Sequence, residues 1–223
     1  MYRQKTFKSR LNFFQSNQEL LVSFGVALLC FFSSLFFPAQ NSAQVITKNL
    51  FFLVLFPVLY IKLVLKQDPS DFGWNLKSKT GSISWGIGIT IFTLLLFYLM
   101  LKFTLFGTNY VLGDYAKNNF WLFLVYELLV VNFSLFIFSY FFQGFLLFTF
   151  QKKFESWAIA AQAILFFASL FFTKSLSWQV APFILLSITG GFLSYKTKSF
   201  LYSYFMSIFV IIILDTYIIY STK

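Results

Sequence analysis

The chain has 223 residues, of which 59% are hydrophobic, 24% are aromatic and only 11% are charged. A soluble core of this size cannot hide so much apolar surface, so lipid must be the solvent for much of the chain. The net charge of +10 does not indicate nucleic-acid binding, because basic residues that border apolar spans on one side of a membrane give the same total. The composition therefore predicts an all-α, polytopic membrane helix bundle.

Apolar runs of about 20 residues, the length that crosses a hydrocarbon core of ~30 Å, predict seven spans. These runs are residues 20–37, 50–65, 83–105, 120–150, 157–172, 178–195 and 200–220. The fourth is too long for a bilayer, so we expect it to tilt or to project into the cytoplasm. A basic lead-in, residues 1–18, precedes the first span. No internal repeat and no long linker interrupts the chain, so residues 1–223 form a single transmembrane domain.

The polar segment between the second and third spans contains an Asp68-Pro69 turn and the aromatic sequence Phe72-Gly73-Trp74. Gly and Pro mark turns, and tryptophan is typical of the membrane–water interface. We expect a turn followed by an interfacial aromatic anchor.

The basic residues provide an independent test of this layout. With the N-terminus inside, twelve of the 17 flank cytoplasmic ends of spans: Arg3, Lys5, Lys8, Arg10, Lys62, Lys66, Lys77, Lys79, Lys152, Lys153, Lys196 and Lys198. The other side holds Lys48, Lys102, Lys117, Lys174 and Lys223. This asymmetry predicts about seven spans with the N-terminus in and the C-terminus out.

Histidine is absent from the chain, and Cys30 is the single cysteine. Histidine is the commonest metal ligand and the usual general base near neutral pH. We therefore expect no bound metal and no cofactor. One cysteine also excludes an intrachain disulfide.

The fourth span ends in the sequence SYFFQGFLLFTFQKKF, residues 139–154. Its FFQGFLL portion and the basic QKKF that follows resemble the first motif of the CAAX protease and bacteriocin-processing (CPBP, or Abi) family of intramembrane proteases. Two further stretches match later motifs of that family in the same order. They are the apolar helix 157–170 with its QAILF sequence, and the pair Gly190-Gly191 followed by TKSF at 197–200. The resemblance covers residues 120–220 and implies a cavity between the fourth to seventh helices.

The residues that this family uses for chemistry are replaced throughout. The resemblance aligns the family's paired glutamates with Phe138 and Ser139, and its arginine with Gln143. It aligns the two histidines with Leu170 and Ser207, and the asparagine with Ile211. None of these side chains can act as a general base near neutral pH, and a serine nucleophile would lack an activating partner. The resemblance therefore implies a pseudoprotease without catalytic residues.

Glu127 and Asp215 are the only acids within the predicted spans. A carboxylate at membrane depth costs on the order of 3 kcal/mol, so it usually faces a cavity or a partner. Glu127 could line the cavity or pair with a basic residue of a partner protein, or it could make a hydrogen-bonded helix contact with Asn132 or Asp215. Asp215 could also reach the far interface.

Gln143 and Gly144 could line a cavity that opens toward the cytoplasm. Alternatively, the amide bonds a neighbouring helix that the glycine allows to approach. The candidate cavity or partner-binding residues are Glu127, Asn132, Ser139, Gln143, Gly144, Ser207 and Asp215.

The sequence favours a noncatalytic scaffold or binding subunit in the inner membrane of a bacterium. Its expected partners are membrane lipid and another membrane protein or a hydrophobic peptide. The enzyme alternative is a divergent CPBP protease, a CAAX-type endopeptidase that uses Glu127, Asp215 or a residue of a partner. A lipid-handling or transport protein is a third possibility, which is weaker because no pair of broken helices occurs in matching halves of the chain.

Overall fold

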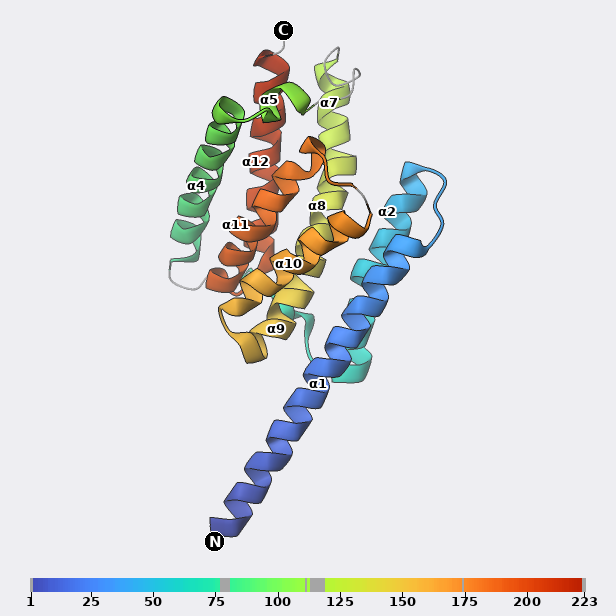
Figure 1. Cartoon of the computed structure of the whole chain (residues 1–223), viewed down its shortest axis with the longest axis vertical. Coiled ribbons are helices and arrows are strands. Elements are labelled where there is room, and N and C mark those ends of the chain that lie inside the picture. Colours follow the sequence, from blue (N-terminus) through green and yellow to red (C-terminus); the bar gives the residue numbers. More distant parts are fainter. Residues whose placement is uncertain (1, 77–80, 111, 113–118, 174, 222–223) are drawn as a thin grey trace.

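The computed structural model describes residues 2–76, 81–110, 112, 119–173 and 175–221, without the side chains of residues 2–17 and 42. These described residues form helices joined by short connections and include no strand. The all-α, polytopic helix bundle is therefore confirmed (Figure 1). The lysines at 77, 79, 117, 174 and 223 and the basic side chains of the lead-in, on which the charge asymmetry partly rests, lie outside this description.

The N-terminal hairpin begins with α1 (Tyr2–Phe36), in which the basic lead-in and the first span form one continuous helix. Asn41 then caps α2 (Ser42–Leu50), because its Oδ1 accepts the Gln44 N–H at 2.9 Å. The second span continues through η1 (Phe51–Leu55), α3 (Phe56–Leu59) and η2 (Tyr60–Leu65). Turns of the wider π type lie on both sides of Pro57, which cannot donate a backbone hydrogen bond.

The central part of the chain contains a short 3₁₀ turn, η3 (Pro69–Phe72), the third span α4 (Ser82–Phe103) and the short helix α5 (Phe106–Asn109). The fourth span is one continuous helical rod of 35 residues. It consists of α7 (Phe120–Tyr126), η4 (Glu127–Val131), α8 (Asn132–Phe138), η5 (Ser139–Leu146) and α9 (Leu147–Phe154). Its two π-helical segments carry Glu127 and the FFQGFLL motif, respectively.

The C-terminal part consists of α10 (Trp157–Phe172), the 3₁₀ turn η6 (Trp178–Val180), α11 (Ala181–Thr197) and α12 (Phe200–Ser221). Six helices of the described chain are long and apolar enough to cross a membrane, which makes this a multi-pass membrane protein. The expected fifth span, α10, has only 16 residues and falls short of that length. It runs obliquely across the bundle, and the start of α1 and the end of α12 lie at opposite ends of the molecule (Figure 1).

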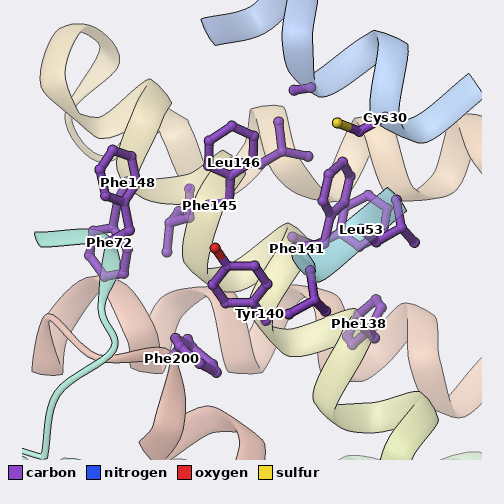
Figure 2. Close-up of a cluster of buried hydrophobic side chains, with 14 of the residues drawn as sticks. Cys30, Leu53, Phe72, Phe138, Tyr140, Phe141, Phe145, Leu146, Phe148 and Phe200 are labelled. Carbon is purple, nitrogen blue, oxygen red and sulfur yellow. The ribbon is translucent and has the colours of Figure 1, made fainter. Parts of the chain in front are cut away.

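The core is centred on η5, where all eight residues are buried. Aromatic rings from the segment after the second span, from the fourth span and from the start of α12 pack together around it (Figure 2). Many other large apolar side chains, such as Trp121, Leu63 and Phe172, are exposed on the outside of the bundle. Lipid covers such surface in a membrane, so the exposed and the buried apolar residues fit the same architecture.

Candidate functional site

The motif positions of the fourth span lie inside the bundle and not on a solvent-filled surface. Ser139, Gln143 and Ser207 are each 0% exposed. Phe138 occupies one of the aligned glutamate positions, and its ring packs 4.8 Å from the ring of Phe166. The remaining aligned positions, Leu170 and Ile211, are also apolar and buried. Hydrocarbon side chains therefore fill three of the six positions that the resemblance aligns with catalytic residues of the family.

Two glutamines bind the backbone of α11 beside its glycine pair. Gln143 Nε2 donates to Leu186 O at 2.9 Å, and Gln162 Nε2 donates to Ser187 O at 2.6 Å. In an α-helix these two carbonyls also accept the N–H groups of Gly190 and Gly191, four residues later. A Cβ at Gly190 would lie 2.5 Å from Gln143 Nε2. The glycines are therefore required for the two amides to reach the helix backbone.

The hydrogen bond from Gln143 to α11 agrees with one of the two interpretations of this residue, in which its amide binds a neighbouring helix. The equivalent role of Gln162 was missed, although Gln162 was part of the second motif. Two adjacent glycines and two buried glutamines on neighbouring helices are the signal that could have indicated it.

Several polar atoms at this level have no hydrogen-bond partner among the described residues. They are Ser139 Oγ, Tyr140 Oη, Gln143 Oε1, Gln162 Oε1 and Ser207 Oγ. A buried polar atom without a partner costs roughly 1–3 kcal/mol. These groups are hydroxyls and amides, which do not exchange protons near neutral pH as a general base must.

The segment Phe72-Gly73-Trp74 covers one end of this region, which is the end expected to face the cytoplasm. Phe72 O lies so close to Gly144 that a Cβ at Gly144 would be 3.3 Å away from it. Trp74 packs against Tyr140, with 5.2 Å between the ring centroids. The interpretation in which Gln143 and Gly144 line a cavity that opens toward the cytoplasm is therefore wrong for this conformation, because the segment covers Gly144 and Gln143 is wholly buried.

Glu127 and Asp215 form a buried pair between the first part of the fourth span and the last part of α12. Their carboxyl groups lie close enough to interact electrostatically, and Tyr110 Oη donates to Asp215 Oδ1 at 2.9 Å. Glu127 is 3% exposed and Asp215 is 2% exposed, so Asp215 does not reach the interface. Asn132 is not part of the pair, since its Oδ1 accepts from Tyr204 Oη at 2.6 Å.

The two acids lie at different separations from the aligned motif positions: Glu127 is 11 residues before Phe138, and Asp215 is one helical turn after Ile211. Glu127 precedes Gln143 by 16 residues, which corresponds to about 24 Å along a helix. Elsewhere in the described chain, Lys152 forms an ion pair with Glu19, with 3.2 Å between Nζ and Oε1. Burial, and then the neighbouring Asp215 carboxylate, raise the pKa of Tyr110 above its ordinary value, so its hydroxyl remains a hydrogen-bond donor to the pair.

An apolar pocket of about 120 Å³ lies between α1, η5 and α10. Its lining includes Ala27, Phe31, Phe142, Leu165, Ala168 and Phe172. The one lining hydroxyl, on Ser169, donates to Phe166 O at 2.5 Å and so is not available to a ligand. The exposed Phe32 and Phe172 place the rim of the pocket on the lipid-facing surface. This pocket involves the first, fourth and fifth spans and not the fourth to seventh helices that the resemblance implied.

The described residues contain no group of three or more histidine, cysteine, aspartate or glutamate side chains that could hold a metal ion. The chain matches no protein-family model, no curated protein and no solved structure. The similarity to the CPBP family therefore rests on the motif residues of the sequence alone.

Proposed function

We propose that this chain is a catalytically inactive, CPBP-like membrane protein that serves as a scaffold or binding subunit. The observation that supports this proposal most directly is the packing of the side chains at the aligned motif positions. Gln143 and Gln162 are bonded to the backbone of α11, and Phe138 and Leu170 fill the places of an acid and a histidine. Hydrolysis at this level would need a group that activates water, and the residues there offer only amides, hydroxyls and hydrocarbon.

The binding role is supported by the apolar pocket between α1, η5 and α10. A pocket without available polar groups, with its rim on the lipid-facing surface, selects a hydrocarbon ligand. A lipid acyl chain or an apolar side chain from a transmembrane helix of a partner meets this requirement. We propose the inner membrane of a bacterium as the location, in keeping with the resemblance.

Capture of the tagged chain from native membranes in a detergent-free polymer tests this role. We expect a stoichiometric membrane protein, peptide or lipid to accompany the chain. Ala168→Phe fills the pocket and should remove that partner, whereas Leu29→Phe changes an exposed position on α1 and should retain it. A chain that emerges alone, or a partner that Ala168→Phe leaves in place, would contradict the proposal.

The pairing of Glu127 with Asp215 favours one alternative, a divergent intramembrane protease. Two carboxyl groups that share a proton can act as acid and base, as in the aspartic proteases. The burial of both carboxyl groups argues against this use, because water must reach an acid and a base that hydrolyse a peptide bond. Cleavage of a CAAX-type peptide in vesicles that is abolished by Glu127→Ala, or a stoichiometric transition metal in the purified protein, would establish the enzyme instead.

A further inference from the structure

The segment Pro69–Asn75 folds as a 3₁₀ turn followed by Gly73, and it is bound to the rest of the molecule in the way that a peptide turn is bound by a receptor. Phe72 is 1% exposed and serves as the anchoring side chain. Its ring lies 6.0 Å from the ring of Phe145, and the Lys152 ammonium is 5.1 Å from its centroid. Figure 2 shows Phe72 inserted beside Phe145 and Phe148, with Tyr140 and Phe200 on the other side.

The backbone of the segment is held by hydrogen bonds to the turn between α11 and α12. Gly73 O accepts both the Phe200 N–H at 3.2 Å and the Ser199 hydroxyl at 3.1 Å. The Ser199 hydroxyl is also within bonding distance of Asn75 O, and Asn75 Nδ2 donates to Lys198 O at 3.3 Å. Main-chain bonds of this kind supply affinity for a peptide, and a side-chain pocket supplies specificity.

Gly73 is the residue on which this fit depends. Its φ of +83° is one that residues with a Cβ rarely adopt. A Cβ at this position would overlap the ring of Phe148 and lie 3.0 Å from Phe200 N. Trp74 then packs on Phe136, Tyr140 and Phe200, so the segment fills the cleft between the inner end of the fourth span and the start of α12.

We propose that this cleft is a peptide-binding site and that Pro69–Asn75 is its internal, displaceable occupant. The ligand is a peptide turn that presents an aromatic side chain, then a small residue whose carbonyl accepts two hydrogen bonds, then a second aromatic side chain. The tethered segment competes with such a peptide at a high effective concentration and so keeps the cleft closed. This inference goes beyond the proposed function, because it gives the cytoplasmic end of the bundle a ligand of its own.

Thiol labelling tests whether the segment closes the cleft. Ser199 is 0% exposed beneath the segment, so Ser199→Cys in a Cys30→Ala background reports on its displacement. We expect Gly73→Ala to raise the rate of labelling by a membrane-impermeant maleimide, added from the cytoplasmic side, about tenfold. Gly81→Ala is the matched control, because Gly81 has a φ of +93° and a Cβ there meets nothing within 4 Å. It should leave the rate unchanged.

A peptide-protection experiment tests whether the opened cleft binds peptide. The probe is the synthetic peptide PSDFGWN, and the control peptide has alanine in place of phenylalanine and tryptophan. In the chain that carries Gly73→Ala together with Ser199→Cys, we expect the probe, and not the control, to protect the introduced thiol from maleimide. Protection by neither peptide or by both equally would overturn the assignment of a peptide site.

A second variant covers the case in which Gly73→Ala fails to displace the segment. The double change Phe72→Ala with Trp74→Ala removes both aromatic anchors. Rapid labelling of the introduced thiol in this folded variant, with protection by the probe, supports the proposal. Slow labelling of the introduced thiol in both variants would overturn the proposal. Rapid labelling of Ser199→Cys in a chain whose Pro69–Asn75 segment is unchanged would also overturn it. The Ala168→Phe capture experiment concerns another pocket and can fail while this one succeeds.

Discussion

Gly190→Ala is expected to destabilise the bundle through the glutamine that approaches this position. The new Cβ would lie 2.5 Å from Gln143 Nε2 and 2.9 Å from Gln143 Oε1. The amide must move, which breaks its bond to Leu186 O, or α11 must move away from η5. Both outcomes act at the most deeply buried part of the molecule.

The size of the effect follows from three terms. Overpacking a well-packed core costs about 1–3 kcal/mol, and a side-chain hydrogen bond within a membrane contributes about 0.6 kcal/mol. Replacing glycine by alanine inside a helix returns about 0.5–1 kcal/mol. The free energy of unfolding should therefore fall by about 1–3 kcal/mol. Gly86→Ala on α4 is the matched control, because its Cβ meets nothing within 4 Å, and it should be stabilising by about 0.5–1 kcal/mol.

Reversible unfolding in mixed detergent micelles, followed by the fluorescence of the five tryptophans, measures these differences. A double-mutant cycle with Gln143→Ala isolates the contact, since shortening the glutamine removes the overlap. We expect a coupling energy of about 1–3 kcal/mol between the two positions. Equal stabilities of Gly190→Ala and Gly86→Ala, or a coupling near zero, would refute the account of the glutamine–glycine contact.

Three further predictions concern other contacts. Tyr110→Phe removes the donor to Asp215 Oδ1 and should lower the free energy of unfolding by about 1 kcal/mol, whereas Tyr98→Phe, at an exposed position, should leave the thermal midpoint unchanged. Glu19→Gln breaks the half-exposed ion pair with Lys152 and leaves the lysine over Phe72 in place. It should cost less than about 1 kcal/mol at low ionic strength and nothing at high ionic strength, and an equal loss at both would exclude a screened ion pair. Single cysteines at Ala43 and Ser70 in a Cys30→Ala background should be labelled by an impermeant maleimide from opposite sides of the membrane, and labelling from one side would exclude the expected topology.

Much of the fold follows from the lengths of the apolar runs. The predicted runs 83–105 and 200–220 correspond to α4 (Ser82–Phe103) and α12 (Phe200–Ser221), because a helix is the only open segment that satisfies its own backbone in lipid. The excess length of the fourth span was also evident. The two π-helical segments of this span could not be predicted. A wider helical turn is recognised in a sequence by a change in hydrophobic periodicity, and a run that is apolar on every face has no such periodicity.

The candidate site was only partly predictable. The aligned motif positions indicated which residues would gather near η5, and Asp215 was one of the two partners suggested for Glu127. The role of Phe72-Gly73-Trp74 was assigned to the membrane interface, where tryptophan is common, and Phe72 is instead a buried anchor. That difference depends on the shape of a cleft formed by the fourth span and by the turn before α12, which are distant in the sequence and so are not part of any local pattern.

The short α10 has a consequence for the surrounding bilayer. Its 16 residues extend over about 24 Å, which is less than a hydrocarbon thickness of ~30 Å. Lipids in contact with it must shorten or disorder their tails, and such hydrophobic mismatch costs a fraction of a kcal/mol per Å and sorts proteins into thinner membranes. Because the same helix forms one wall of the apolar pocket, we expect the lipids in contact with α10 to lie at the entrance of the pocket.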